Sequence, residues 1–165
     1  QSAAFIRRGY PLSVFTQAVY ALAERNIPVV VHIILGLPGE SRETVLRTID
    51  YLNRLPIQGV KLQLLHVLSD SDLADLYRAG EYTPLEKEEY LTLVGDCIAH
   101  LRADIVLHRL TGDGDKNTLL APLWSLRKRD VLNHLHRYLR ENHIRQGMSC
   151  KIDLSVIYNK PKDVL

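Results

Sequence analysis

Three short apolar runs, each followed by a segment with helical spacing, are the feature that most limits how this chain can fold. The runs occupy residues 28–35, 59–65 and 104–109, and the first is apolar at almost every position. A strand covered on both faces in a parallel sheet has this composition. Because strands that alternate with helices are joined by right-handed crossovers, the pattern predicts an α/β fold with a parallel sheet.

Apolar residues at helical spacing predict what joins these runs. Ser13 can cap the start of a first helix, and Asn26 can end it in a left-handed turn. The remaining helices are expected at 45–52, 70–78, 86–101 and around 131–139. A closed eight-stranded barrel usually needs about 250 residues, whereas this chain has 165. Three strands therefore form either an arc of a barrel or a small open sheet, and we expect a piece of something larger.

Composition excludes few classes of function. The chain is 46% apolar and 24% charged, as in ordinary single-domain proteins, and its net charge of +2 argues neither for nor against a nucleic-acid partner. No apolar run reaches the length of a membrane span, and the N-terminal residues lack a signal-peptide pattern. Cys97 falls in an apolar helical segment, far from Cys150, so a buried free thiol and a cytoplasmic setting are expected.

The first apolar run ends abruptly in Gly-Leu-Pro-Gly-Glu-Ser, residues 36–41. Ligands of parallel α/β folds bind at the carboxyl ends of strands, where this turn is expected. Alternation places His32, Ile34 and Gly36 on one side of the strand, where a glycine would admit a planar ligand close to the backbone. Glu40 would reach the mouth of such a site. The same turn can also form with nothing bound, so both interpretations remain open.

The second strand offers further polar candidates. Lys61 and Gln63 share one side and could face a barrel lumen, although Lys61 could instead face solvent at an exposed sheet edge. His66 follows the end of this strand, where the loops of such folds contact substrate. We therefore predict a functional role for His66 and for Gln63.

A glycine-rich segment, HRLTGDGDKNT, follows the third strand, but its lysine spacing is not that of a phosphate-binding loop. Gly112 and Gly114 could fold an active-site lid that carries Asp113, or could form a simple turn. Alternation predicts that His108 and Arg109 point to opposite sides of the strand, so that at most one faces a lumen.

Histidines are frequent in the last helical segment, but they lack the spacing of metal ligands. His134 and His136 lie two residues apart and do not face each other, and His143 lies two turns beyond His136. We predict a surface cluster and no metal site.

Six ordered blocks covering most of the chain resemble the C-terminal half of radical S-adenosylmethionine (SAM) enzymes. The likeness is greatest to an uncharacterised bacterial Fe–S oxidoreductase subfamily related to the elongator catalytic subunit. The blocks are IRRGY at 6–10, HIILGLPGES at 32–41, GVKLQLLHVL at 59–68, GEYTPLEKEEYLTLV at 80–94, IVLHRLTGDG at 105–114 and LLAPLWSLRKRDVLN at 119–133. The resemblance implies a partial (βα) barrel with an extra C-terminal helix over residues 1–149. A tail at 150–165 follows, which could form an edge strand.

The resemblance also implies a SAM site. The fifth barrel strand of that superfamily carries a G-x-I-x-G-x-x-E-like motif whose backbone and isoleucine contact the adenosyl group. Here Ile34 and Gly36 match that motif, and Gly39 with Glu40 matches its P-G-E variant. His32 replaces the first small or acidic residue.

The resemblance also implies that an arginine near the start of the chain contacts the cofactor. Arg8 falls where many relatives carry an arginine after the fourth strand, and it could pair with the methionine carboxylate of SAM; the adjacent Arg7 is an equal candidate. Gln63 completes the predicted cofactor-binding set, while His66 and Asp113 form the predicted catalytic set.

The chain departs from the family in its cysteines. The C-x-x-x-C-x-x-C loop that holds a [4Fe–4S] cluster is absent, and Cys97 and Cys150 cannot replace it. We therefore expect a parent enzyme that cleaves SAM to a 5′-deoxyadenosyl radical acting on an unknown substrate, with this piece inactive alone. The alternative is a non-enzymatic partial barrel that binds a nucleotide or a partner. Self-association through an exposed sheet edge is also expected, and kinship with the elongator subunit suggests RNA as a partner by analogy only.

Overall fold

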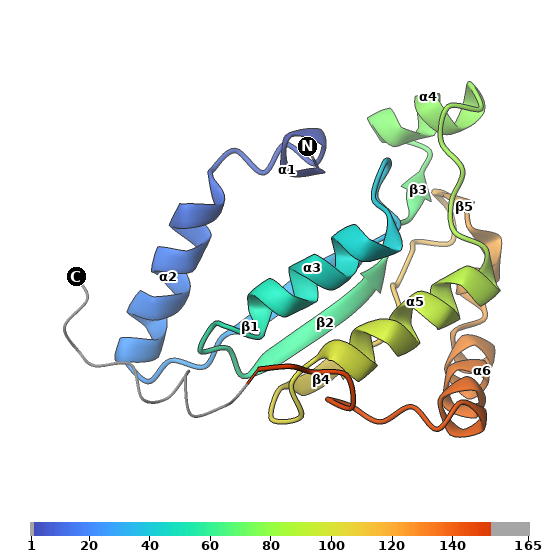
Figure 1. Ribbon diagram of the computed structural model, residues 1–165. Coiled ribbons are helices and arrows are strands. Elements are labelled where there is room, and N and C mark those ends of the chain that lie inside the picture. The colour runs from blue at the N-terminus through green and yellow to red at the C-terminus, as the bar shows by residue number, and fades with distance from the viewer. Residues whose placement is uncertain (1, 153–165) are drawn as a thin grey trace.

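A parallel three-stranded sheet forms the centre of the computed structural model, which describes residues 2–152 (Figure 1). Its strands are β1 (Val30–Leu35), β2 (Gly59–Leu64) and β4 (Val106–Arg109), in the order β1-β2-β4. Both neighbouring pairs are parallel, so the predicted α/β fold is confirmed. The helices are α1 (Ser2–Phe5), α2 (Leu12–Glu24), α3 (Arg42–Leu52), α4 (Asp72–Arg78), α5 (Lys87–His100) and α6 (Lys128–Glu141), with a short 3-10 helix at Leu123–Leu126.

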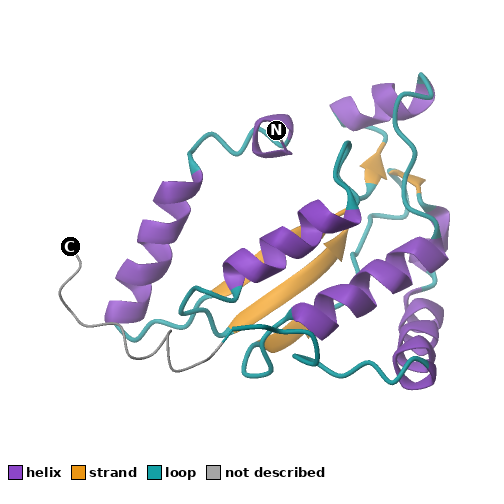
Figure 2. Cartoon of the chain, viewed as in Figure 1, coloured by secondary structure: helices purple, strands orange, loops and turns teal. Residues whose placement is uncertain are grey.

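Helices α3 and α5 cover one face of this sheet (Figures 1 and 2). The main core lies between these helices and the sheet. The other face is open: along β1 exposed and buried residues alternate, and Val30 is 37% exposed. The expectation that the first strand is covered on both faces is therefore wrong. Its apolar outward residues are those that a complete barrel would enclose.

A second, two-stranded sheet was not expected from the sequence. Strand β3 (Val67–Leu68) pairs antiparallel with β5 (Leu119–Ala121), just beyond the carboxyl end of β2. The pair carries a small core of its own that includes Ala74 and Tyr82. It extends the molecule at the end of the sheet where the candidate site lies (Figure 2).

The helix boundaries follow local signals in most places. Asn26 has a φ of 56° and ends α2 in the predicted left-handed turn. Ser41 caps α3, because its side chain accepts a hydrogen bond from the backbone of Thr44. Ser13 does not cap α2, since the helix already begins at Leu12 and Pro11 occupies the cap position.

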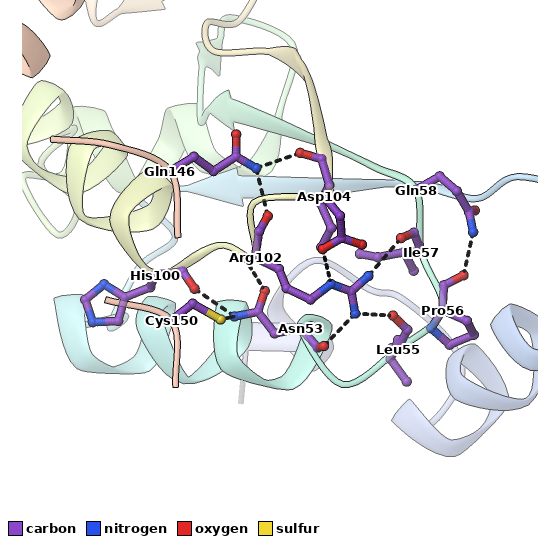
Figure 3. Close-up of polar contacts among 11 residues, drawn as sticks. Asn53, Leu55, Pro56, Ile57, Gln58, His100, Arg102, Asp104, Gln146 and Cys150 are labelled. Atoms are coloured by element: carbon purple, nitrogen blue, oxygen red, sulfur yellow. Dashed lines mark hydrogen bonds and ion pairs between the residues drawn. The ribbon is translucent and has the colours of Figure 1, made fainter. Parts of the chain in front are cut away.

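A buried arginine stabilises the opposite, amino end of the strands (Figure 3). Arg102 is 1% exposed, and its guanidinium donates to the carbonyl oxygens of Asn53, Leu55 and Ile57 at 2.7, 3.2 and 3.2 Å. The carboxylate of Asp104 accepts a further bond at 2.8 Å. These contacts give buried hydrogen-bond partners to backbone carbonyls of the loop from α3 to β2.

Two amides extend this network. The side chain of Asn53 accepts from the backbone of Arg102 and donates to the carbonyl of His100, at 2.9 and 2.8 Å. Gln146, beyond α6, donates to the carbonyls of Arg102 and Ile105 at 2.8 and 2.6 Å. The C-terminal segment is thereby joined to the turn between α5 and β4 (Figure 3).

Two remaining predictions concern the C-terminal tail and membrane-spanning helices. The edge strand expected in the tail of 150–165 falls mainly on residues 153–165, which lie outside the described part. Within residues 2–152, no helix is both long enough and apolar enough to cross a membrane.

Candidate functional site

The turn after β1 has the geometry that its sequence predicts. The carbonyl of Leu37 accepts a hydrogen bond from the backbone of Glu40 at 3.1 Å, which closes a tight turn. Pro38 and Gly39 occupy its central positions, and the φ of 74° at Gly39 is the one that a type II turn requires. Ser41 then begins α3. The chain thus passes directly from the open face of β1 to the helix that covers its other face.

Gly36 is required by the fold itself. Its φ is 93°, and a Cβ atom there would lie 3.2 Å from the side chain of Leu85. Its carbonyl accepts a hydrogen bond from the hydroxyl of Tyr82 at 2.8 Å. The chain's own leucine therefore fills space in which the sequence predicted room for a ligand. A role for Gly36 in cofactor binding remains a prediction.

Four residues of the predicted cofactor set line one cavity of about 540 Å³. These are Arg8, His32, Ile34 and Glu40, and the cavity lies between the N-terminal segment, β1 and α3. Its volume is in the usual range for small-molecule sites, which is roughly 300–1,000 Å³. Positions far apart in the sequence thus converge on a space large enough for a small ligand.

The structure separates the two candidate arginines. Arg8 lines the cavity, and its guanidinium lies over the ring of Tyr10, 5.2 Å from the ring centre. Arg7 forms an ion pair with Asp72 at the start of α4 and does not line the cavity. Arg8 is therefore the arginine whose position suits a carboxylate bound in the cavity.

Gln63 joins this group through a neighbouring strand. His32 Nδ1 donates to Gln63 Oε1 at 3.1 Å, which fixes the proton on that ring nitrogen. The two strands are in register here, with Ile34 opposite Gln63. The structure therefore brings the predicted residues of β1 and β2 onto one face.

His66 lies against the glycine-rich loop. A Cβ atom at Gly112 would fall 2.5 Å from the ring, and one at Gly114 would fall 3.2 Å from it. Nε2 of His66 is buried without a hydrogen-bond partner among the described residues. Burial lowers the pKa of His66, an effect that the nearby Asp113 partly opposes. The imidazole is thus held neutral under a loop whose glycines make room for it.

Asp113, the other predicted catalytic residue, is already bound by two cations. It accepts a hydrogen bond from Lys128 at 2.6 Å and forms an ion pair with Arg109 at 3.2 Å. The hydrogen bond from Lys128 is the main reason that the pKa of Asp113 lies below its usual value. This geometry holds the loop against α6 and β4. A catalytic role for Asp113 stays a prediction.

A register shift interrupts the pairing of β4 with β2. Val60 pairs with Leu107, but Lys61 pairs with Arg109, so His108 is an extra residue in the strand. Its ring lies over Gly59, where a Cβ atom would be 2.5 Å away. The strict alternation expected for His108 and Arg109 therefore does not hold, because a bulge interrupts it.

The cysteines do not suit an iron–sulfur cluster. Cys97 is fully buried in the core, and burial raises the pKa of its thiol to about 12. Cys150 lies next to Asn53 at the far end of the sheet. Within residues 2–152, no three histidine, cysteine or acidic side chains are arranged to hold a metal ion. The described residues thus supply no ligand set for the cluster, while binding of SAM by the residues that line the cavity remains a prediction.

Comparison with known families identifies the family of the chain. A family described as the Radical_SAM C-terminal domain matches residues 57–141, just over half of the chain. The chain belongs to the radical SAM C-terminal domain family. The match begins just before β2 and ends with α6, so it includes Gln63, His66 and Asp113. The turn after β1 lies outside it.

Relatives of this radical SAM C-terminal domain occur in bacteria and in an archaeon. The chain is 31% identical to the uncharacterized protein YtqA of Bacillus subtilis, over 89% of the chain and 46% of the relative. It is 31% identical to protein YhcC of Escherichia coli, over 84% and 45%. It is 32% identical to the uncharacterized protein MJ0486 of Methanocaldococcus jannaschii, over 86% and 44%. The chain thus spans just under half the length of these curated relatives, and membership of a bacterial subfamily remains a prediction.

A solved structure shares the fold. The archaeal Methanocaldococcus infernus Elp3 with an N-terminus deletion superposes with a TM-score of 0.74, at 16% identity. The likeness covers 88% of this chain and 34% of that one. Together with the family match, it confirms the predicted relation to radical SAM proteins and the partial radical SAM barrel.

Proposed function

We propose that this chain is the cofactor- and substrate-facing part of a radical SAM enzyme and that it is inactive alone. The observation that carries the proposal is the convergence of Arg8, His32, Ile34 and Glu40 on one cavity of about 540 Å³, in a chain of this family. The relatives are about twice as long as the chain, which leaves room in such proteins for the other half of a barrel.

Each residue would have a distinct part in holding SAM. The guanidinium of Arg8 would pair with the methionine carboxylate, because it lines the cavity and has no carboxylate partner among the described residues. Ile34 would offer an apolar surface to the adenosyl group. Glu40, beside the turn, would bind polar groups at the rim of the cavity. The bond between His32 and Gln63 would keep both side chains fixed along the open face.

Bound SAM, next to a reduced [4Fe–4S] cluster, supplies a 5′-deoxyadenosyl radical to such enzymes. The cluster would have to be held outside this chain, because Cys97 is buried in the core and Cys150 lies at the far end of the sheet. The chain's own residues would orient SAM and, with the rest of the barrel, exclude water from it. His66, at the carboxyl end of β2, would lie on the substrate side.

Binding measurements test this proposal directly. Equilibrium dialysis of the chain against SAM should show saturable binding that Arg8→Gln weakens about tenfold or more, as expected when a charge-assisted hydrogen bond is lost. Binding of 5′-deoxyadenosine, which has no carboxylate, should not change in Arg8→Gln. Arg7→Gln is the matched control, because this neighbour does not line the cavity. Failure of the wild-type chain to bind SAM, or equal losses in the two variants, would contradict the proposal.

A further inference from the structure

The central strand of the sheet carries a lysine that the candidate SAM site does not use. Lys61 is half-buried on β2, and it does not line the 540 Å³ cavity. The described residues give its ammonium no hydrogen bond and no ion pair. In register with it lie His32 on β1 and Arg109 on β4. A row of basic residues therefore crosses all three strands at one level.

No acidic side chain on the sheet balances this row. The three strands read VVHIIL, GVKLQL and VLHR, and none contains Asp or Glu. The acids that flank β4 in the chain already have cationic partners: Asp104 bonds Arg102, and Asp113 is paired with Arg109 and Lys128. Among residues 2–152, the charge of Lys61 therefore has no ion-pair partner. Partial burial lowers the effective dielectric around this charge and so strengthens its attraction for an anion.

The surroundings of Lys61 also supply hydrogen-bond donors. Gln63, two residues along the same face, uses its oxygen to accept from His32, which leaves its amide NH₂ without a bond in the described part. The ring of His108 lies over Gly59 on the other side of Lys61 along the strand, and among residues 2–152 it also makes no hydrogen bond. An ammonium, an amide NH₂ and an imidazole therefore gather on one open face. Anionic oxygens are the groups that such donors bind.

We propose that the open face around Lys61 binds a carboxylate or phosphate group of an anionic small-molecule substrate. This inference rests on the proposed function, since it names the class of substrate for the same enzyme. The anion would lie on β2, beside the cavity assigned to SAM rather than in it. Lys61 would be its main charged partner, with Gln63 and His108 as neutral donors on either side.

Titration of the chain with inorganic phosphate and with acetate tests the site. Side-chain NMR signals of Gln63 and His108 should shift saturably, and the affinity should fall as salt is added. Lys61→Gln should weaken the binding of at least one anion about tenfold or more, because a hydrogen bond to a charged group is lost. Lys61→Arg should retain binding. Lys151→Gln, an equal change of charge at an exposed residue near the other end of the sheet, should leave the affinity unchanged.

The same samples separate this inference from the proposed function. Anion binding that depends on Lys61, in a chain that fails to bind SAM, would support the anion site and reject the cofactor assignment. Equal anion affinities in the wild type and in Lys61→Gln would overturn the anion site, whatever the result with SAM. A single-stranded RNA that binds through Lys61 a hundredfold more tightly than phosphate would also overturn it, in favour of a polynucleotide.

Discussion

The imidazole of His66 fills the space that a side chain at Gly112 would need. An ideal Cβ atom at position 112 would lie 2.5 Å from the ring, too close for any real contact. The loop that carries Asp113 and the histidine at the end of β2 are therefore packed as one unit. This contact explains why the loop needs glycine, a requirement that the sequence motif alone leaves open.

Gly112→Ala should lower the free energy of unfolding by about 1–3 kcal/mol, the usual cost of overpacking a filled site. In the double variant, His66→Ala should remove most of the destabilisation that Gly112→Ala causes, because the added Cβ atom clashes with the imidazole ring. Urea denaturation of both single variants and of the double variant measures the coupling. Strictly additive losses would show that His66 and Gly112 do not share this space.

The stability of the chain should fall below neutral pH because of His66. Burial lowers its pKa in the folded state from the ordinary value of 6.5, so the unfolded chain binds a proton more readily than the folded chain does. This contribution is fully present above about pH 6.5, and it decreases as the pH falls below that value. Unfolding measured at pH 7.5 and pH 5.5 should show a larger loss for the wild type than for His66→Gln. Equal losses would contradict the burial argument.

Replacement of Arg102 should be among the most damaging substitutions in the chain. Arg102→Met removes the guanidinium that bonds Asp104 and three backbone carbonyls, so that the carbonyls of Asn53 and Ile57 lose this donor in the core. We expect a loss of roughly 3–5 kcal/mol, as for one partner removed from a buried charged network. Arg25→Met is the control, because Arg25 is exposed and its side chain bonds a helix carbonyl, that of Ala21. A loss of less than about 1 kcal/mol in Arg102→Met would show that the network adds little.

Local signals are what made parts of the fold predictable. Asn26 and the Pro38–Gly39 turn adopt their conformations because of their own backbone preferences. The apolar runs predict the strands directly. Arg102 gives no such signal, because its partners are mainly backbone carbonyls about 45 to 50 positions away. The bulge at His108 also has no local sequence signal, because it arises from the pairing of β4 with β2.

The proximity of several candidate-site residues was predictable for a different reason. His32, Ile34 and Glu40 stand together in one motif, and the resemblance to a family gave Arg8 its place beside them. The structure distinguishes the positions of Arg8 and Arg7, because of the two only Arg8 lines the cavity. The packing of Leu85 against Gly36 could not be predicted from the sequence, because it joins the turn after β1 to the segment before α5. The lack of an ion-pair partner for Lys61 among the described residues likewise appears only when all three strands are in register.

The free edge of β1 should lead copies of the chain to associate. Within residues 2–152, β1 pairs with β2 on one side and with no strand on the other, so its outer backbone groups are available to another strand. We propose that two copies pair through this edge, and that light scattering will show a mass that rises with concentration. Val30→Lys should reduce the association, because Val30 is 37% exposed and a lysine on an edge strand opposes pairing. Val106→Lys, on the opposite edge strand, is the matched control and should leave the association unchanged. A mass that stays monomeric at all concentrations, or equal effects of the two variants, would rule out pairing through β1.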